Sequence, residues 1–178
     1  MALRLESLND RVRVFMAQEV EFDITGDTLY KSKHFNETGN STYLELIRQT
    51  VQHYDDNWLA ERIRRGNCMN RTTMRRKPKG GYTEAKVAVT APDTFAEGEF
   101  NRFYARGLCL HAIETGVPSL LVYRAKAVAV PRADSEAMIG RLISASALLQ
   151  DLRTHQGVDT ALGLPNGPNS GLSVRLPE

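Results

Sequence analysis

Eight cationic side chains, with no carboxylate among them, are concentrated in residues 62–79. They are Arg62, Arg64, Arg65, Arg71, Arg75, Arg76, Lys77 and Lys79. The remaining 15 of the 23 basic residues face 21 acidic ones, so the rest of the chain is mildly acidic although the net charge is +2. Lys and Arg contacts release counterions from a phosphate backbone, which favours binding of a polyanion. We therefore expect residues 62–79, the basic segment, to contact nucleic acid or another polyanion.

The basic segment contains no Phe, Tyr or Trp. Single-stranded bases are bound largely by stacking on such rings, so this composition favours contacts to the phosphate backbone over base reading. Two other interpretations stay open for the same residues. The segment could pair with an acidic protein surface, or it could be a solvated loop that binds nothing.

Acidic and apolar side chains alternate over residues 19–24, and this period of two predicts a half-buried strand. Its acidic face would carry Glu19, Glu21 and Asp23, and three convergent carboxylates could hold a hard cation. No glycine-rich ligand loop accompanies them, so we expect a water-facing strand edge instead. A second interpretation makes this edge the docking surface for the basic segment of a neighbouring copy.

Glu84, Ala85 and Lys86 stand at the start of a predicted strand, where some metal-dependent nucleases place a Glu-x-Lys triplet. With Glu97 or Glu99 nearby, this arrangement would suit a small nucleic-acid-processing enzyme. The nearest upstream acid lies 23 positions before the triplet, so the second carboxylate of such a site is missing. We assign no catalytic residue and predict no metal.

Two further groups of residues are more typical of structure than of chemistry. Glu99, Arg102 and Arg106 fall at spacings of three and seven, which predicts an ion-paired polar helix face. Cys109 lies in an apolar helical stretch and is expected to be buried, whereas Cys68 beside the basic segment is expected to be exposed. No paired Cys/His spacing, P-loop or dinucleotide fingerprint is present, so we predict no cofactor.

Hydrophobic periodicity and turn residues predict the elements that would position these groups. The expected order is a helix over 4–18, a hairpin over 19–30, a helix from a capping box at Thr42 and Glu45 to residue 63, a long exposed loop or ordered arm over 67–81, a strand over 82–90, a helix from Thr94 to Gly116, a strand over 120–130 and short helices over 134–152. The best-defined apolar stripes predict a core built from Tyr43, Ile47, Val51, Tyr54, Trp58, Phe100, Phe103, Tyr104 and Leu108.

These elements predict an α+β domain over residues 1–156, with a small mixed β-sheet and three to four helices. Residues 82–130 would form a strand–helix–strand unit, right-handed if its strands are parallel. Residues 157–178 are rich in Gly and Pro and are expected to form an extended C-terminal arm. Only Leu172, Val174 and Leu176 could be buried in it, so deleting this arm is expected to leave a folded core.

No signal peptide or membrane-spanning run is evident, so we expect no membrane partner and an intracellular, cytoplasmic location, or a virion-associated one for a viral component. The interpretation that we favour is a non-enzymatic assembly or structural protein, of a virion or nucleoprotein kind. Its basic segment would contact nucleic acid, and that segment and the C-terminal arm would contact other copies or a protein partner. The alternatives are the metal-dependent enzyme above and a protein-binding regulatory module.

Overall fold

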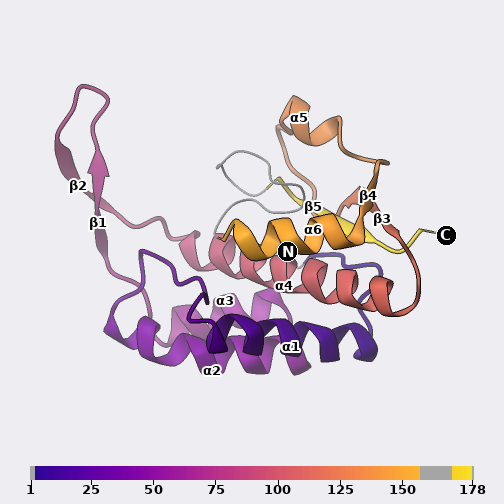
Figure 1. The fold of residues 1–178 in the computed structure, drawn as a ribbon. Helices are drawn as coiled ribbons and strands as arrows, with labels where there is room; N and C mark the ends of the chain where they lie inside the picture. The colour runs from indigo at the N-terminus through magenta and orange to yellow at the C-terminus, as the bar shows by residue number, and fades with distance from the viewer. Residues whose placement is uncertain (1–2, 157–169, 178) are drawn as a thin grey trace.

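The computed structural model describes residues 3–156 and 170–177 and shows an α+β fold, as the sequence predicts (Figure 1). Its elements in chain order are α1 (Asp10–Thr25), α2 (Glu37–His53), α3 (Asp56–Arg65), β1 (Thr72–Arg76), β2 (Tyr82–Lys86), α4 (Ala91–Glu114), β3 (Ser119–Arg124), α5 (Ala133–Glu136), β4 (Leu142–Ser144), α6 (Ala145–Thr154) and β5 (Leu172–Arg175).

Helix α4 is the centre of the fold and packs against α1, α3 and α6 (Figure 1). Every residue over 99–109 is buried, so this helix is covered on all sides and shows no single apolar stripe. Its first residue is Ala91, with Pro92 in the first turn, where a missing backbone N–H costs nothing. The capping-box start predicted at Thr94 is therefore wrong, while the stop near Gly116 is confirmed by its φ of 75°.

Helix α1 continues through the residues for which a strand was predicted. Asn9 caps its first turn by accepting a hydrogen bond from the Val12 N–H, and the helix then runs to Thr25. In this conformation Glu19 and Asp23 lie one turn apart on the same buried face, and Glu21 points elsewhere. The predicted acidic strand edge is thus wrong, because tertiary contacts override the alternating pattern.

Two arginines, one from α4 and one from α6, explain why these carboxylates are buried. Arg106 is fully buried and donates to Glu19 and to both oxygens of Asp23 at 2.7–2.8 Å. Arg153 of α6 closes over Glu19 from the other side, through a hydrogen bond of 3.0 Å. Burial by itself would raise the pKa of Glu19, but hydrogen bonds and charge from Arg153 and Arg106 outweigh it and lower that pKa. One buried ion cluster therefore joins α1, α4 and α6.

Glu99 and Arg102 form the ion pair that the sequence predicts, with a distance of 2.6 Å. The predicted polar face is wrong, however, because both side chains are buried rather than water-facing. Asp23 lies 3.7 Å from Arg102 and so links this pair to the Arg106 cluster. Burial raises the pKa of Glu99 despite its arginine partner.

The single long helix predicted over 42–63 is in fact two helices, which changes the core. Asn36 caps α2 at Glu37, and the chain extends at Tyr54 before Asp55 caps α3. The break shifts the helical phase, so Tyr54 is exposed and Trp58 is only half-buried, stacked on Tyr54 at 4.1 Å between ring centroids. Both were wrongly predicted to be core residues, and the loss of stability on truncating Trp58 should fall below that of a buried tryptophan. The other seven predicted core residues are buried.

Asp56 is buried beneath the N-terminal segment, where it accepts a hydrogen bond from the Leu3 N–H at 3.2 Å. Burial raises its pKa from 3.8 to about 6. The folded state thus binds a proton more tightly than the unfolded state, so this carboxyl costs stability as pH rises from about 4 to above 6. We expect Asp56→Asn to stabilise the protein, relative to wild type, by about 1 kcal/mol more at pH 7.5 than at pH 5. Urea unfolding of both proteins at each pH measures this difference, and a gap independent of pH would contradict it.

The strands form two antiparallel sheets, one of two strands and one of three in the order β4-β3-β5, rather than one mixed sheet. Strands β2 and β3 lie in different sheets, so the predicted unit over 82–130 is wrong, and β3 ends at Arg124 rather than residue 130. Strand β5 lies in the C-terminal arm and pairs with β3. The part of the C-terminal arm over 157–169 lies outside the described residues.

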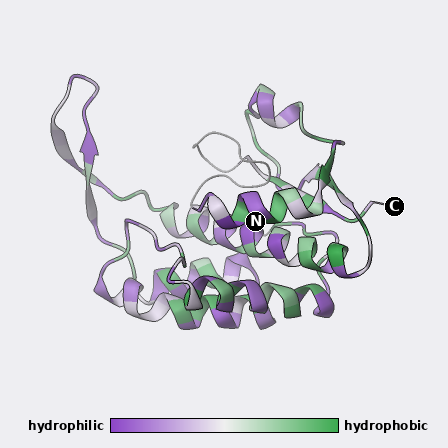
Figure 2. Ribbon diagram, viewed as in Figure 1, coloured by the Kyte–Doolittle hydropathy of each residue, from purple (hydrophilic) through white to green (hydrophobic). Residues whose placement is uncertain are grey.

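Hydrophobic and hydrophilic residues are interspersed along the helices, as the hydropathy colouring of Figure 2 shows. Within the described ranges, no helix combines the length and apolar character needed to cross a lipid bilayer.

Candidate polyanion-binding surface

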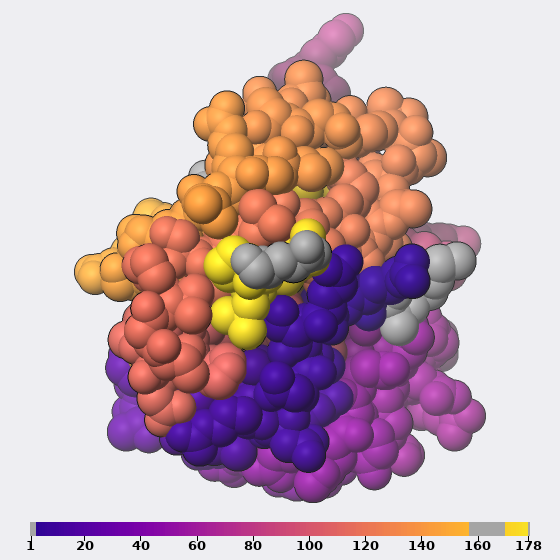
Figure 3. All heavy atoms as spheres, turned by 90° about the vertical axis from the view of Figure 1, so that its right-hand side faces the viewer, coloured from indigo at the N-terminus to yellow at the C-terminus, as the bar shows by residue number. Residues whose placement is uncertain are grey.

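The basic segment ends in a β-hairpin that stands away from the body of the protein (Figures 1 and 3). Strands β1 and β2 pair from Thr72 with Lys86 to Arg76 with Tyr82. The turn is closed by a hydrogen bond from the Lys77 N–H to the Gly81 carbonyl. Gly81 has a φ of 76°, a conformation that favours glycine, and Gly80 shares this left-handed region. The glycine pair therefore shapes the hairpin turn. We call residues 71–87 the basic arm. Of the two forms predicted for residues 67–81, an exposed loop or an ordered arm, the structure shows the ordered arm.

The root of the basic arm is fixed to the start of α2. Asn36 donates a side-chain hydrogen bond to the Asn67 carbonyl at 2.6 Å, and its backbone N–H donates to the Cys68 carbonyl at 3.0 Å. The Asn70 N–H donates to the His34 carbonyl at 2.8 Å. Since Asn36 also caps α2, a single side chain sets both the start of that helix and the direction in which the arm leaves.

Close packing at this root requires a glycine inside α2. A Cβ at Gly39 would lie 2.2 Å from the Cys68 carbonyl oxygen, which is closer than atoms can approach. Cys68 is itself buried, so its predicted exposure is wrong, whereas the predicted burial of Cys109 is confirmed. The thiol of Cys68 packs beneath the arm and is not presented to solvent.

The eight predicted binding residues are all exposed, but they fall into two groups. Arg62, Arg64 and Arg65 lie on the last turn of α3 and are engaged within the protein, by Trp58, Asp93 and Glu61 respectively. The other five lie on the basic arm, and their side chains form no ion pair within the part of the chain that the structure describes; they are Arg71, Arg75, Arg76, Lys77 and Lys79. The arm is therefore where unpaired positive charge is concentrated.

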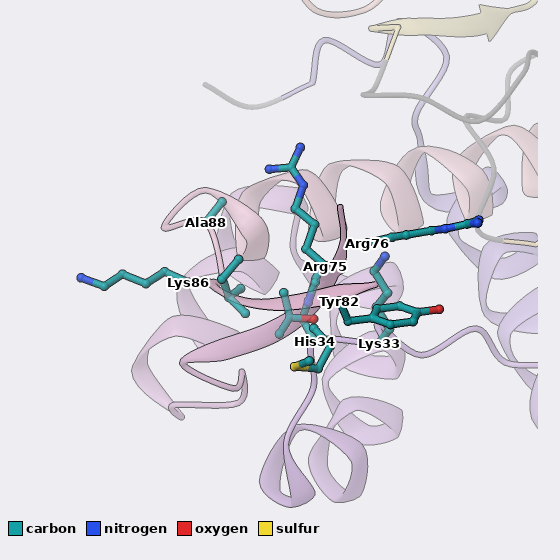
Figure 4. Close-up of a pocket in the computed structure, with 11 residues that line it drawn as sticks. Lys33, His34, Arg75, Arg76, Tyr82, Lys86 and Ala88 are labelled. Carbon is teal, nitrogen blue, oxygen red and sulfur yellow. The ribbon is translucent and has the colours of Figure 1, made fainter. Parts of the chain in front are cut away.

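Sequence reasoning missed several residues that the hairpin brings to this charge. Tyr82 lies directly across from Arg76 and is 66% exposed, so an aromatic ring does stand beside the basic segment. Lys33, from the loop before α2, lines a hollow of 470 Å³ together with Arg76 and Tyr82 (Figure 4). Lys86 of β2 also lines this hollow and adds another cation. Residues six to fourteen positions apart become neighbours only when the strands pair, and the glycine pair at the turn was the one available signal.

His34 also lines this hollow, but it does not add to the positive charge at neutral pH. Burial, together with the charge of Lys33, lowers the pKa of its imidazole below the usual value. The cationic character of the surface therefore comes from its Lys and Arg side chains.

The carboxylates proposed for a metal-dependent enzyme do not come together. Glu84 lies on the arm across from Met74, Glu97 pairs with Lys126, and Glu99 is buried against Arg102. Within residues 3–156 and 170–177 there is no group of three His, Cys, Asp or Glu side chains that could hold a metal ion.

Comparison with known proteins gives no relative: no protein-family model, no curated protein and no solved structure matches this chain.

Proposed function

We propose that this protein contacts nucleic acid, or a polyanion of similar charge density, through the basic arm, as a non-enzymatic assembly or structural component. The observation that carries the proposal is the set of five exposed Arg and Lys side chains without an ion-pair partner in the described residues. They belong to a two-stranded projection that is anchored at its root and extends away from the body. Phosphates would supply the counter-charge for which the described residues offer no ion pair there.

The fate of the chain's own acidic residues supports an external partner. Glu19 and Asp23 are consumed by the buried arginine cluster, and Glu21 pairs with Arg48. The acidic strand face, which a second interpretation made the docking surface for a neighbouring copy's basic segment, is therefore absent. A virion or nucleoprotein setting, inside the cell, fits such a component, with contacts between copies made by other surfaces.

Neutralising the arm should abolish most of the salt dependence of binding. Each phosphate contact on duplex DNA contributes about −0.9 to the slope of log affinity against log salt. We expect the variant carrying Gln in place of Arg75, Arg76, Lys77 and Lys79 to bind more weakly on every sequence alike, with a slope flatter by about three to four. Fluorescence anisotropy of a labelled duplex over a series of salt concentrations measures both quantities.

A matched control removes the same charge from the body of the protein. Replacing Arg4, Arg11, Arg48 and Arg141 by Gln lowers the net charge equally, but away from the arm, and should change the slope by less than about one. Wild-type protein that binds neither DNA nor RNA at low salt would refute the proposal, and the arm would then be a docking element for an acidic protein.

A further inference from the structure

The shape of the basic arm limits the class of ligand further than its charge does. It is a two-stranded antiparallel ribbon, and no strand of the described residues pairs with either of its outer edges. Its strands lie about 4.8 Å apart, and five residues per strand span about 17 Å. The major groove of B-form DNA is about 12 Å wide and about 8.5 Å deep and admits a two-stranded ribbon, whereas the minor groove is about 6 Å wide.

One face of this ribbon is slim. Successive strand residues point to opposite sides, so Thr73, Arg75, Thr83 and Ala85 share a face. Three of these four side chains are small, which lets the ribbon backbone approach a groove floor closely. The opposite face carries Met74, the arm's single carboxylate Glu84, and the larger ring of Tyr82.

The cations are placed for two walls of phosphate rather than one. Arg75 and Arg76 are adjacent in β1 and therefore extend to opposite faces of the ribbon. Figure 4 shows their side chains leaving the strand in different directions. Lys77 and Lys79 lie in the turn, and Lys86 extends from β2 near the root. A ribbon inserted between two phosphate backbones would meet negative charge on both sides, which matches this distribution.

We propose that the basic arm enters the major groove of B-form duplex DNA; this inference rests on the function proposed above and names its ligand class. Single strands fit less well, because a projecting arm with Tyr82 as its one aromatic residue offers no channel and no row of rings for stacking. Duplex RNA also fits less well, since the major groove of an A-form helix is deep and narrow.

The experiment compares DNA duplex, RNA duplex and single-stranded DNA of equal length at one salt concentration, by competition against a labelled DNA duplex. We expect the DNA duplex to bind at least about tenfold more tightly than either competitor. A major-groove ligand such as methyl green should displace the protein, and the minor-groove ligand netropsin should not. Equal affinity for the three nucleic acids, or displacement by netropsin alone, overturns the groove assignment while leaving the proposed function intact.

A charge-neutral variant tests the shape directly. Thr83→Trp places a large ring on the slim face, in a strand position that tolerates aromatic residues, and leaves every cation in place. We expect it to weaken binding to duplex DNA by about fivefold or more without changing binding to single strands. Val130→Trp, at an 85% exposed position in the body, is the matched control. Unchanged duplex affinity in Thr83→Trp would contradict entry of this face into the groove.

Discussion

Replacing Arg106 by methionine should cost about 3–5 kcal/mol of folding free energy, the loss expected when one partner of a buried ion pair is removed. The substitution leaves Asp23 without the two hydrogen bonds that it accepts from Arg106, in a site closed to water. Glu19 keeps its hydrogen bond from Arg153, so the substitution does not leave this carboxylate without a partner. Urea unfolding followed by the fluorescence of Trp58, the sole tryptophan, measures the loss.

The matched control is Arg48→Met, which breaks an arginine–carboxylate pair between α2 and α1 at the surface. That change should cost under about 1 kcal/mol, because exposed ion pairs contribute little. Combining Arg106→Met with Glu19→Gln and Asp23→Leu removes the unpaired charge and should recover part of the stability. An Arg106→Met loss no larger than that of the control would show that the cluster does not hold the helices together.

Removing residues 170–178 should unfold the protein, contrary to what the composition of the C-terminal arm predicts. Leu172 and Val174 of β5 are fully buried against the core. Two buried side chains of α4 also depend on this strand, since Asn101 donates to the Leu172 carbonyl and Tyr104 to the Val174 carbonyl. Truncation would leave both polar groups unsatisfied as well as opening the core.

A single substitution tests the same strand more gently. Leu172→Ala should cost about 2–5 kcal/mol by chemical denaturation, as for other buried leucines. Val130→Ala, at an exposed position, should change stability by less than about 0.5 kcal/mol. Circular dichroism of the chain lacking residues 170–178 tests whether truncation unfolds the protein. A cooperative thermal transition close to that of the full chain would contradict this expectation.

The sequence predicts the fold class and most of the core because helical stripes such as Tyr43 and Ile47 report burial on one side. Hydrophobic periodicity misleads where a helix is buried on all sides or has charged side chains in the core. Glu19 with Asp23, and Arg102 with Arg106, each stand four residues apart, so two complementary charged pairs at helical spacing were visible. The alternating pattern around them was the stronger local signal, and only the packing of α1 on α4 decides between the two.

The arrangement of the candidate polyanion-binding surface could be predicted from the sequence only in part, for a similar reason. Local composition locates the basic residues, but it does not show which of them already have partners. Arg64 and Arg65 are satisfied by Asp93 and Glu61, at 2.7 Å and 2.5 Å. Strand pairing, which brings Tyr82 to Arg76, depends on the turn at Gly80 and Gly81 more than on the residues that it joins.

The basic arm also connects two portions of the chain that pack against each other. Helices α1, α2 and α3 precede it and α4 with the three-stranded sheet follows it, yet these two portions meet along the α1–α4 and α3–α4 contacts. Covalent continuity at the arm's turn thus adds little to an interface already made by packed helices. A backbone interrupted between Lys79 and Gly80 would have the topology of a noncovalent heterodimer, and foreign sequence inserted there would leave the assembled halves undisturbed.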